Sequence, residues 1–300
     1  MHISIAGRLG SGKSTICNIL KARYGYQIYS TGEIHREIAN RQNVSTLEMN
    51  KILTKDSSHD YNIDDAVTEI SIEKSSEVII FDSRMAWKFA KNSFKVFVVV
   101  DPLVAAKRVI KSPRGAVEVY TSIEDAKLKL IERSQVENER FKQIYNVDNF
   151  DYSNYNLVID STYASPEKLA SVIYNKYKKY CEGPDNYEAC EILMAPTSLF
   201  PLNKMRNISS KIVDEYRASQ EYRKRPISII AFDGYHFIVN GHHRMLAAAL
   251  NNEQFVDVKL ASFQENLIST AQLVGISGVY DFEAAGNFRY ASYPNIYIRQ

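Results

Sequence analysis

The chain has 300 residues, of which 45% are hydrophobic and 24% charged, and its formal net charge is only +2. This composition is typical of a globular protein with a full hydrophobic core, and the length suggests two domains. It excludes collagen-like and extended disordered chains, and the near-neutral charge does not favour DNA as a partner. Three scattered cysteines without a C-x-x-C pair indicate a reducing, cytoplasmic setting, and no apolar run is long enough to cross a membrane.

The first motif in chain order is "GRLGSGKST" (7–15), which follows a predicted strand at 2–6. Its spacing is that of a Walker A loop, and the residues after it have the apolar periodicity of a helix that stops at Gly25. Such a loop closes its backbone N–H groups around phosphates, its lysine adds positive charge, and its serine offers a hydroxyl to a metal. We therefore predict ATP and Mg²⁺ as ligands of a loop made of Gly7, Gly10, Ser11, Gly12, Lys13, Ser14 and Thr15.

Short apolar strands alternate with helical patterns through the rest of residues 1–182. The strands are predicted at 27–30, 78–81, 95–100 and 156–160. A closing helix is predicted at 165–180, with Ser165 as its N-cap before a proline. This alternation predicts an α/β domain in which helices cover both faces of a parallel sheet.

A carboxylate and an arginine follow the predicted strand at 78–81. Asp82 is placed to support Mg²⁺ directly or through water, and Arg84 falls at the mouth of the sheet, where ligands bind. No guanine-reading Asn-Lys-x-Asp motif follows a strand, and no transporter-type signature helix is present. The pattern therefore favours a small-molecule kinase over a GTPase or a transporter ATPase.

Further arginines surround the predicted site. The segment "YSTGEIHREIA" (29–39) turns after Thr31 and carries Arg36 one turn into a helix, where it can reach an acceptor phosphate. We assign both residues to the acceptor, together with the arginine at the mouth of the sheet.

A long polar helix is predicted at 122–145, beginning with a capping box of Ser122 and Asp125. Arg133 and Arg140 are two turns apart and share a face, and Arg108 and Arg114 flank the approach to this helix. We expect a helical lid that brings positive charge to the transferred phosphoryl group and excludes water. The catalytic residues predicted are Lys13, Asp82, Arg133 and Arg140, with Ser14 and Asp82 as metal ligands.

Residues 1 to about 178 resemble the cytidylate kinase-like family, particularly its archaeal branch. The blocks that carry the resemblance are "GRLGSGKST", "STGEIHREIA", "FDSRMAW", "VFVVVDPLVAAKRV", the segment that starts at "ERSQVENERFKQIY" and the closing helix. The resemblance implies transfer of the γ-phosphoryl group of ATP to a pyrimidine nucleoside monophosphate. It implies that Arg36 and Arg84 hold the acceptor and that Arg108, Arg133 and Arg140 hold phosphates.

One position departs from the family pattern. The family usually reads Asp-Gly-Arg where this chain has Asp82, Ser83 and Arg84. A serine side chain there narrows the acceptor pocket or adds a hydrogen-bond donor, so the sequence leaves the acceptor open.

A second domain is predicted at 190–300, after a polar linker at 181–188. We expect a helix at 207–221, two strands that turn at Asp233-Gly234, a helix at 243–252 and a strand at 255–261, and we assign no role to the aromatic C-terminal extension. The segments "APTSLFPLNKM" and "VNGHHRMLAAALNNEQFVDVKL" resemble the α+β ParB/sulfiredoxin-like fold.

The turn between a strand and a helix of this second domain is a predicted phosphate site, made of Gly241, His242, His243 and Arg244. In the superfamily that it resembles, the equivalent turn holds nucleotide phosphates. Asn240 replaces an aspartate found in members that phosphorylate free serine, so we expect this site to bind without catalysing.

Two alternatives remain open at this stage. The kinase could act on another hydroxyl acceptor, such as a modified DNA base or a small molecule presented by the second domain. The chain could also be a nucleotide-dependent, DNA-associated regulator. The oligomeric state is not indicated.

Overall fold

The computed structural model describes residues 1–31, 58–112, 120–184, 190–201, 208–232, 234–261, 289–290 and 293–297. Arg36, Arg114 and Asp233 lie outside these ranges. The chain divides into two compact units. The first consists of residues 1–161 and 165–190, and the second of residues 162–164 and 191–300. No helix in the described ranges is both long and apolar enough to span a membrane.

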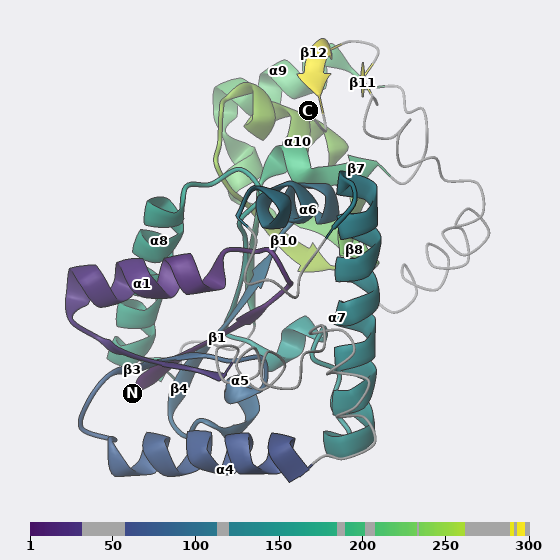
Figure 1. The fold of residues 1–300 in the computed structure, drawn as a ribbon. Coiled ribbons are helices and arrows are strands. Elements are labelled where there is room, and N and C mark those ends of the chain that lie inside the picture. The colour runs from purple at the N-terminus through teal and green to yellow at the C-terminus, as the bar shows by residue number, and fades with distance from the viewer. Residues whose placement is uncertain are drawn as a thin grey trace. The chain divides into compact units, whose positions relative to one another are not determined.

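A parallel sheet forms the centre of the first unit (Figure 1). The strand order is β2-β3-β1-β4-β5. The bounds are β1 His2–Gly7, β2 Gln27–Ser30, β3 Ile79–Asp82, β4 Ser93–Val99 and β5 Leu157–Asp160. Each strand lies within two residues of its predicted ends, so the predicted α/β fold with a parallel sheet is confirmed.

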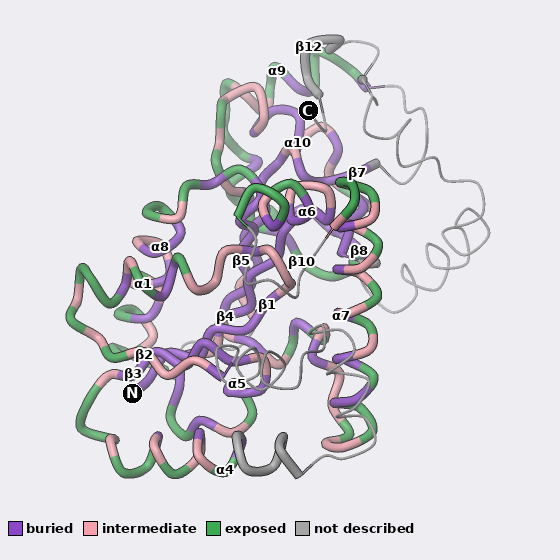
Figure 2. Tube along the Cα trace, in the orientation of Figure 1, coloured by how far each residue is buried: buried purple, intermediate pink, exposed green. Residues whose placement is uncertain are grey.

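The core of this unit lies on and around the central strands. Every residue of β1 is buried, and Figure 2 shows β1 and most of β4 in the colour of buried residues. Phe81, Phe94 and Phe97 are fully shielded from solvent. A strand buried on both faces is mostly apolar, which explains the largely apolar runs in the sequence, and the buried polar residues of β1, His2 and Ser4, are hydrogen-bonded.

Helices connect and cover these strands. They are α1 Lys13–Tyr24, α4 Ser58–Glu73, α5 Ala86–Phe89, α6 Pro102–Lys111, α7 Ile123–Tyr145 and α8 Pro166–Glu182, with a short 3₁₀ turn, η1, at Tyr152–Asn154. Ser165 accepts a hydrogen bond from Lys168 N–H and caps α8 as predicted. The last two residues of α8 overlap the predicted linker at 181–188, so the prediction was wrong there.

Two helix pairs matter for the site (Figure 1). Helix α1 packs on α8, where Tyr24 and Tyr174 stack with ring centroids 3.7 Å apart. Helix α6 packs on α7 through small residues that include Ala105 and Ala126. Ser122 caps α7 by accepting from Asp125 N–H, and the Asp125 carboxylate accepts from Thr121 N–H rather than from the cap residue itself. These two hydrogen bonds cap the N-terminus of α7, the helix that carries the predicted lid arginines.

The second unit has a mixed sheet with the order β6-β10-β8-β9-β7. Its strands are β6 Glu191–Met194, β7 Leu199–Pro201, β8 Ile227–Phe232, β9 Tyr235–Asn240 and β10 Val256–Leu260. Its helices are α9 Ser210–Ser219 and α10 His242–Leu250, with 3₁₀ turns η3 Pro196–Ser198 and η4 Glu221–Arg223. The predicted hairpin, the helix after it and the last strand are present. Two further strands, β11 Arg289–Tyr290 and β12 Tyr293–Tyr297, pair antiparallel.

Candidate active site

The phosphate loop joins the end of β1 to the start of α1. Gly7 pairs with Val98 of β4, and a Cβ added to Gly7 would lie 2.2 Å from the Val98 carbonyl oxygen, so only glycine permits this approach. Lys13 donates from Nζ to the carbonyl oxygens of Gly7 and Arg8, at 3.1 and 3.2 Å. The loop therefore combines a helix N-terminus with a positioned positive charge, which are the two parts of an anion site.

Ser14 and Asp82 meet at the carboxyl end of β3. Ser14 Oγ donates a hydrogen bond to Asp82 Oδ2 at 2.8 Å. A hydroxyl and a carboxylate are hard oxygen ligands, and Mg²⁺ is usually held in kinase sites by one or two carboxylates together with substrate phosphates. The structure thus brings together the two residues predicted as metal ligands, and their chemistry fits Mg²⁺.

Cys17 lies on the buried side of α1, three residues after Ser14, and is 1% exposed. Burial raises the pKa of its thiol well above the usual value, and the negative charge of Asp82 raises it further, whereas Lys13 lowers it. Lys13 and Asp82 therefore both lie within electrostatic range of this thiol.

Glu137 joins two of the predicted arginines. Arg84 Nε lies 2.5 Å from Glu137 Oε2, and Arg133 Nε lies 3.2 Å from Glu137 Oε1. Arg84 follows β3, whereas the other two residues lie one turn apart on α7, so this ion pair links the edge of the sheet to the long helix. The Glu137 side chain is only 5% exposed, so the contact is largely removed from solvent.

Arg84 lies within electrostatic reach of four charged side chains. Burial lowers the pKa of its guanidinium, Glu137 raises that pKa, and Arg133 and Arg140 lower it. Asp82 also raises it. The contacts of Arg84 and Arg133 with Glu137 and the hydrogen bond from Ser14 to Asp82 therefore bring the two arginines and the phosphate loop into one region, with Arg140 within electrostatic range of Arg84.

Arg108 contacts the carboxyl end of β5 from helix α6. Its Nη1 and Nη2 donate to the Oγ and the carbonyl oxygen of Ser161, at 3.2 and 2.6 Å. Burial lowers the pKa of Arg108, and the neighbouring Asp160 raises it. Open α/β sheets bind ligands at this edge, so Arg108 lies on the side of the sheet where a nucleotide would sit.

The residues predicted for the acceptor are described only in part. Thr31 is buried directly after β2, and Arg36 lies outside the described residues. Ser83, which departs from the family pattern, is buried, and its Oγ accepts a hydrogen bond from Met85 N–H at 3.4 Å. Its oxygen is therefore engaged within the turn that leads from β3 into α5.

A buried polar network fixes the end of α7. Asn138 Oδ1 accepts from Asn149 N–H at 2.8 Å, and its Nδ2 donates to Asp148 Oδ1 at 2.9 Å. Asn149 Oδ1 in turn accepts from Trp87 Nε1 at 2.7 Å and from the Tyr155 hydroxyl at 2.8 Å. These bonds join α7 to α5, so they hold the helix with the lid arginines near the segment that carries Arg84.

Sequence reasoning missed two residues of this region. Glu137 is four residues after Arg133 and three before Arg140, a spacing that places all three on one helix face and could have revealed the carboxylate. Arg8 was missed for another reason. Its Cζ lies 3.5 Å from the centroid of the Phe150 ring, and no sequence pattern links residues so far apart in the chain.

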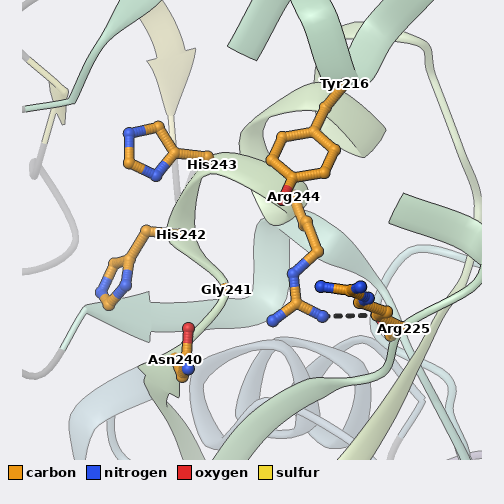
Figure 3. A pocket seen from close by; sticks show the side chains of 7 residues that line it. All are labelled: Tyr216, Arg225, Asn240, Gly241, His242, His243 and Arg244. Atoms are coloured by element: carbon orange, nitrogen blue, oxygen red, sulfur yellow. Dashed lines mark hydrogen bonds between the residues drawn. The ribbon is translucent and has the colours of Figure 1, made fainter. Parts of the chain in front are cut away.

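The second unit has a cavity of about 230 Å³ at the start of α10. Its lining residues are Tyr216, Arg225, Asn240, Gly241, His242, His243 and Arg244 (Figure 3). Arg244 Nη1 donates to the carbonyl oxygens of Arg225 and Pro226, at 2.6 and 2.7 Å. Figure 3 shows the Arg244 guanidinium reaching toward Arg225, while the two imidazole rings project in another direction. The four residues of the predicted phosphate site therefore share one cavity with a second arginine.

A parallel sheet with a Walker loop after its first strand and arginines beside that loop is typical of a P-loop kinase. The comparison with protein families agrees, because residues 2–163 match the model of the cytidylate kinase-like family. The chain belongs to this family.

Curated relatives match the same part of the chain. The cytidylate kinase of Sulfolobus acidocaldarius is 33% identical over 175 residues, which are 58% of this chain and 92% of the relative. The cytidylate kinase of Thermoplasma acidophilum is 30% identical over 177 residues, 59% of this chain and 92% of that protein. The cytidylate kinase of Methanoregula boonei is 28% identical over 173 residues, 58% of this chain and 92% of that protein. The likeness to whole cytidylate kinases is thus confined to somewhat more than half of this chain.

Proposed function

We propose that the first unit transfers the γ-phosphoryl group of ATP to a pyrimidine nucleoside monophosphate, with CMP or dCMP as the first candidates. The observation that supports the proposal is that the hydrogen-bonded pair of Ser14 and Asp82 lies in one region with an arginine cluster, in which Arg84 and Arg133 both contact Glu137 and Arg140 is near. Phosphoryl transfer needs a donor held on one side, an acceptor phosphate held on the other and positive charge between them. The relatives named cytidylate kinase support the choice of acceptor.

On the donor side, the loop from Gly7 to Thr15 would bind the ATP phosphates through backbone N–H groups, with Lys13 beside the β- and γ-phosphates. Ser14 and Asp82 would hold Mg²⁺. When bound, that ion neutralises negative charge on the phosphate oxygens. Arg108 would contact the nucleotide at the edge of the sheet.

On the acceptor side, Arg84 would hold the monophosphate, and we assign Thr31 and Arg36 to the same site from the sequence. An oxygen of the acceptor phosphate attacks the γ-phosphorus while the bond to the β–γ bridging oxygen breaks, and ADP leaves. Arg133 and Arg140 would offset the charge of the transferred group, and α7 would exclude water that could otherwise hydrolyse ATP.

The test is a screen for transfer from labelled ATP to nucleoside monophosphates, free serine, other hydroxyl compounds and DNA oligomers. We expect transfer to pyrimidine monophosphates and a loss of about 10²–10³-fold in the Lys13→Ala variant, because the lysine acts where charge develops. Lys21→Ala is the matched control, since Lys21 is exposed on the same helix. Transfer only to serine, DNA or another hydroxyl compound would replace the acceptor, and an unaffected Lys13→Ala variant would contradict the loop's role.

For the second unit, we propose a phosphate or nucleotide site in the cavity at the start of α10, consistent with the resemblance to the ParB/sulfiredoxin-like fold. Two arginines and a helix N-terminus line this cavity, and a phosphate group needs both charge and N–H donors. A Cβ on Gly241 would lie 3.1 Å from Arg244 Nη2, so the glycine makes room for the guanidinium. Arg244→Ala should abolish binding of labelled nucleoside triphosphate at this site while Lys13→Ala leaves it intact. Arg217→Ala on α9 is the control, and equal binding by all three variants would refute the site.

A further inference from the structure

Arg8 lies in the phosphate loop, but the proposed reaction gives its side chain no role. Its N–H donates to the Val98 carbonyl oxygen at 2.9 Å, which holds the start of the loop on β4. Its own carbonyl oxygen accepts from Lys13 Nζ at 3.2 Å and from Ser11 N–H at 3.3 Å. The backbone of Arg8 therefore helps to set where the lysine ammonium of the loop lies.

The side chain of Arg8 lies on an aromatic ring of a different segment. Its Cζ is 3.5 Å from the centroid of the Phe150 ring, which is van der Waals contact. Both side chains are half-buried, so water screens this cation–π contact only in part. The charge of Arg8 also lowers the pKa of the Tyr152 and Tyr155 hydroxyls, against the larger effect of burial, which raises it. Arg8 thus reaches from the loop to the turn that follows α7.

This turn is joined to two helices of the site. Phe150 N–H and Asn138 Nδ2 both donate to Asp148 Oδ1, at 2.8 and 2.9 Å, which joins the turn to α7. Asn149 Oδ1 accepts from Trp87 Nε1 at 2.7 Å, which joins the turn to α5. Helix α7 carries the proposed lid arginines, and α5 begins just after the arginine proposed for the acceptor. The turn is therefore a common support for the lid and for the acceptor side.

Binding of ATP to the loop would act on Arg8. In the proposed reaction Lys13 lies beside the β- and γ-phosphates, so phosphate oxygens compete with the Arg8 carbonyl for its ammonium. We infer that Arg8 is a positioning residue that couples the phosphate loop to the turn after α7, so that bound ATP helps to place the lid helix for transfer. This inference rests on the proposed function of the first unit.

The fluorescence of Trp87 tests this coupling. Trp87 is the one tryptophan of the chain, and its indole N–H donates to the turn, so its emission is an intrinsic probe of the turn. In a titration with the non-hydrolysable β,γ-imido analogue of ATP and Mg²⁺, we expect a saturating change in emission in the wild type. The change should be lost in Arg8→Met, which removes the cation, and in Phe150→Leu, which keeps an apolar side chain but removes the ring. Arg23→Met should keep the response, because Arg23 is exposed at the far end of α1.

Calorimetry with the same analogue separates coupling from binding. Arg8→Met and Phe150→Leu should bind within about tenfold of the wild type, a difference of about 1.4 kcal/mol, because the N–H groups of the loop and Lys13 are unchanged. Loss of binding in Arg8→Met would make Arg8 a ligand of the nucleotide and would overturn the inference, as would a fluorescence response kept in either variant. A wild type that does not bind the analogue would overturn the proposed function and this inference with it. A wild type that binds it with no change in Trp87 emission overturns the inference alone.

Steady-state assays with ATP and CMP test the coupling in turnover. We expect Arg8→Met and Phe150→Leu each to lower kcat by about 2–30-fold, the range that a cation–π contact can supply, while Arg23→Met stays near the wild type. If the two side chains act through their contact, the double variant should lose kcat by the larger single factor. A loss equal to the product of the two factors, or wild-type kcat in both single variants, would overturn the inference.

Discussion

Gly7→Ala tests whether the phosphate loop depends on the close approach of two backbones. The added Cβ would lie 2.2 Å from the oxygen and 2.7 Å from the nitrogen of Val98. Val98 is fully buried and paired on its other side with Ile159 of β5, so its backbone cannot move away from the added methyl group. Side-chain contacts under 3.0 Å are essentially never seen, so the end of β1 would have to move by at least about 0.8 Å.

The magnitude combines two contributions. Overpacking a tight site costs about 1–3 kcal/mol of unfolding free energy. The φ of 149° at Gly7 is one that alanine rarely adopts, which adds about 1–2 kcal/mol. We expect urea denaturation to show a loss of about 2–5 kcal/mol, and a loop shift near 1 Å would reduce phosphoryl transfer by roughly 10²-fold in the folded fraction.

Gly25→Ala is the control for Gly7→Ala. Gly25 also has a positive φ, of 72°, but an added Cβ would meet no atom within 4 Å. The unfolding free energy lost in Gly25→Ala should therefore reflect backbone strain alone, about 1 kcal/mol. A Gly7→Ala protein no less stable than Gly25→Ala would show that the approach to Val98 is unimportant.

Two further predictions concern buried polar groups. His2 donates from Nε2 to the Ser71 carbonyl, and burial lowers its pKa below 6.5, so the unfolded chain takes up the proton first. The stabilisation by neutral His2 is therefore present above pH 6.5 and is lost as the pH falls below it. In urea titrations from pH 7.5 to 5.5, the difference in unfolding free energy between the wild type and His2→Asn should shrink. A difference that stays constant over this range would contradict the prediction. Asn149→Ala removes the acceptor of the Trp87 indole N–H and should cost about 1–3 kcal/mol. In a Trp87→Phe background that loss should be smaller, and an equal loss would point to another cause.

The fold of the first unit could be predicted from the sequence because its signals are local. Continuous apolar runs mark strands buried on both faces, and β1, β3 and β4 are found where those runs lie. Serine caps likewise mark the starts of α7 and α8. Both signals can be recognised from a few neighbouring residues, and both correspond to elements of the folded protein.

The site could be predicted less completely because its geometry depends on contacts between distant segments. The Walker spacing indicated the residues of the loop, but the hydrogen bond from Ser14 to Asp82 depends on the register of β3 beside β1. The spacing of Glu137 from Arg133 and Arg140 places it on their helix face, but its contact with Arg84 could not be predicted, because Arg84 lies in a distant segment of the chain. The linker prediction failed at its start because α8 continues through Glu182, where polar residues extend the helix to Gly183.

The shielded thiol beneath the phosphate loop gives this protein a built-in reporter. Thiol reagents attack the thiolate, and Cys17 is both inaccessible and held in its protonated form, whereas Cys181 is exposed. In a background with Cys181→Ser and Cys190→Ser, which removes the exposed and the partly exposed thiol, modification of Cys17 would proceed only through transient openings of helix α1, so its rate measures the local stability of the loop. Ligands of the loop should slow that modification in proportion to their occupancy, which provides a binding assay that needs neither turnover nor a labelled nucleotide.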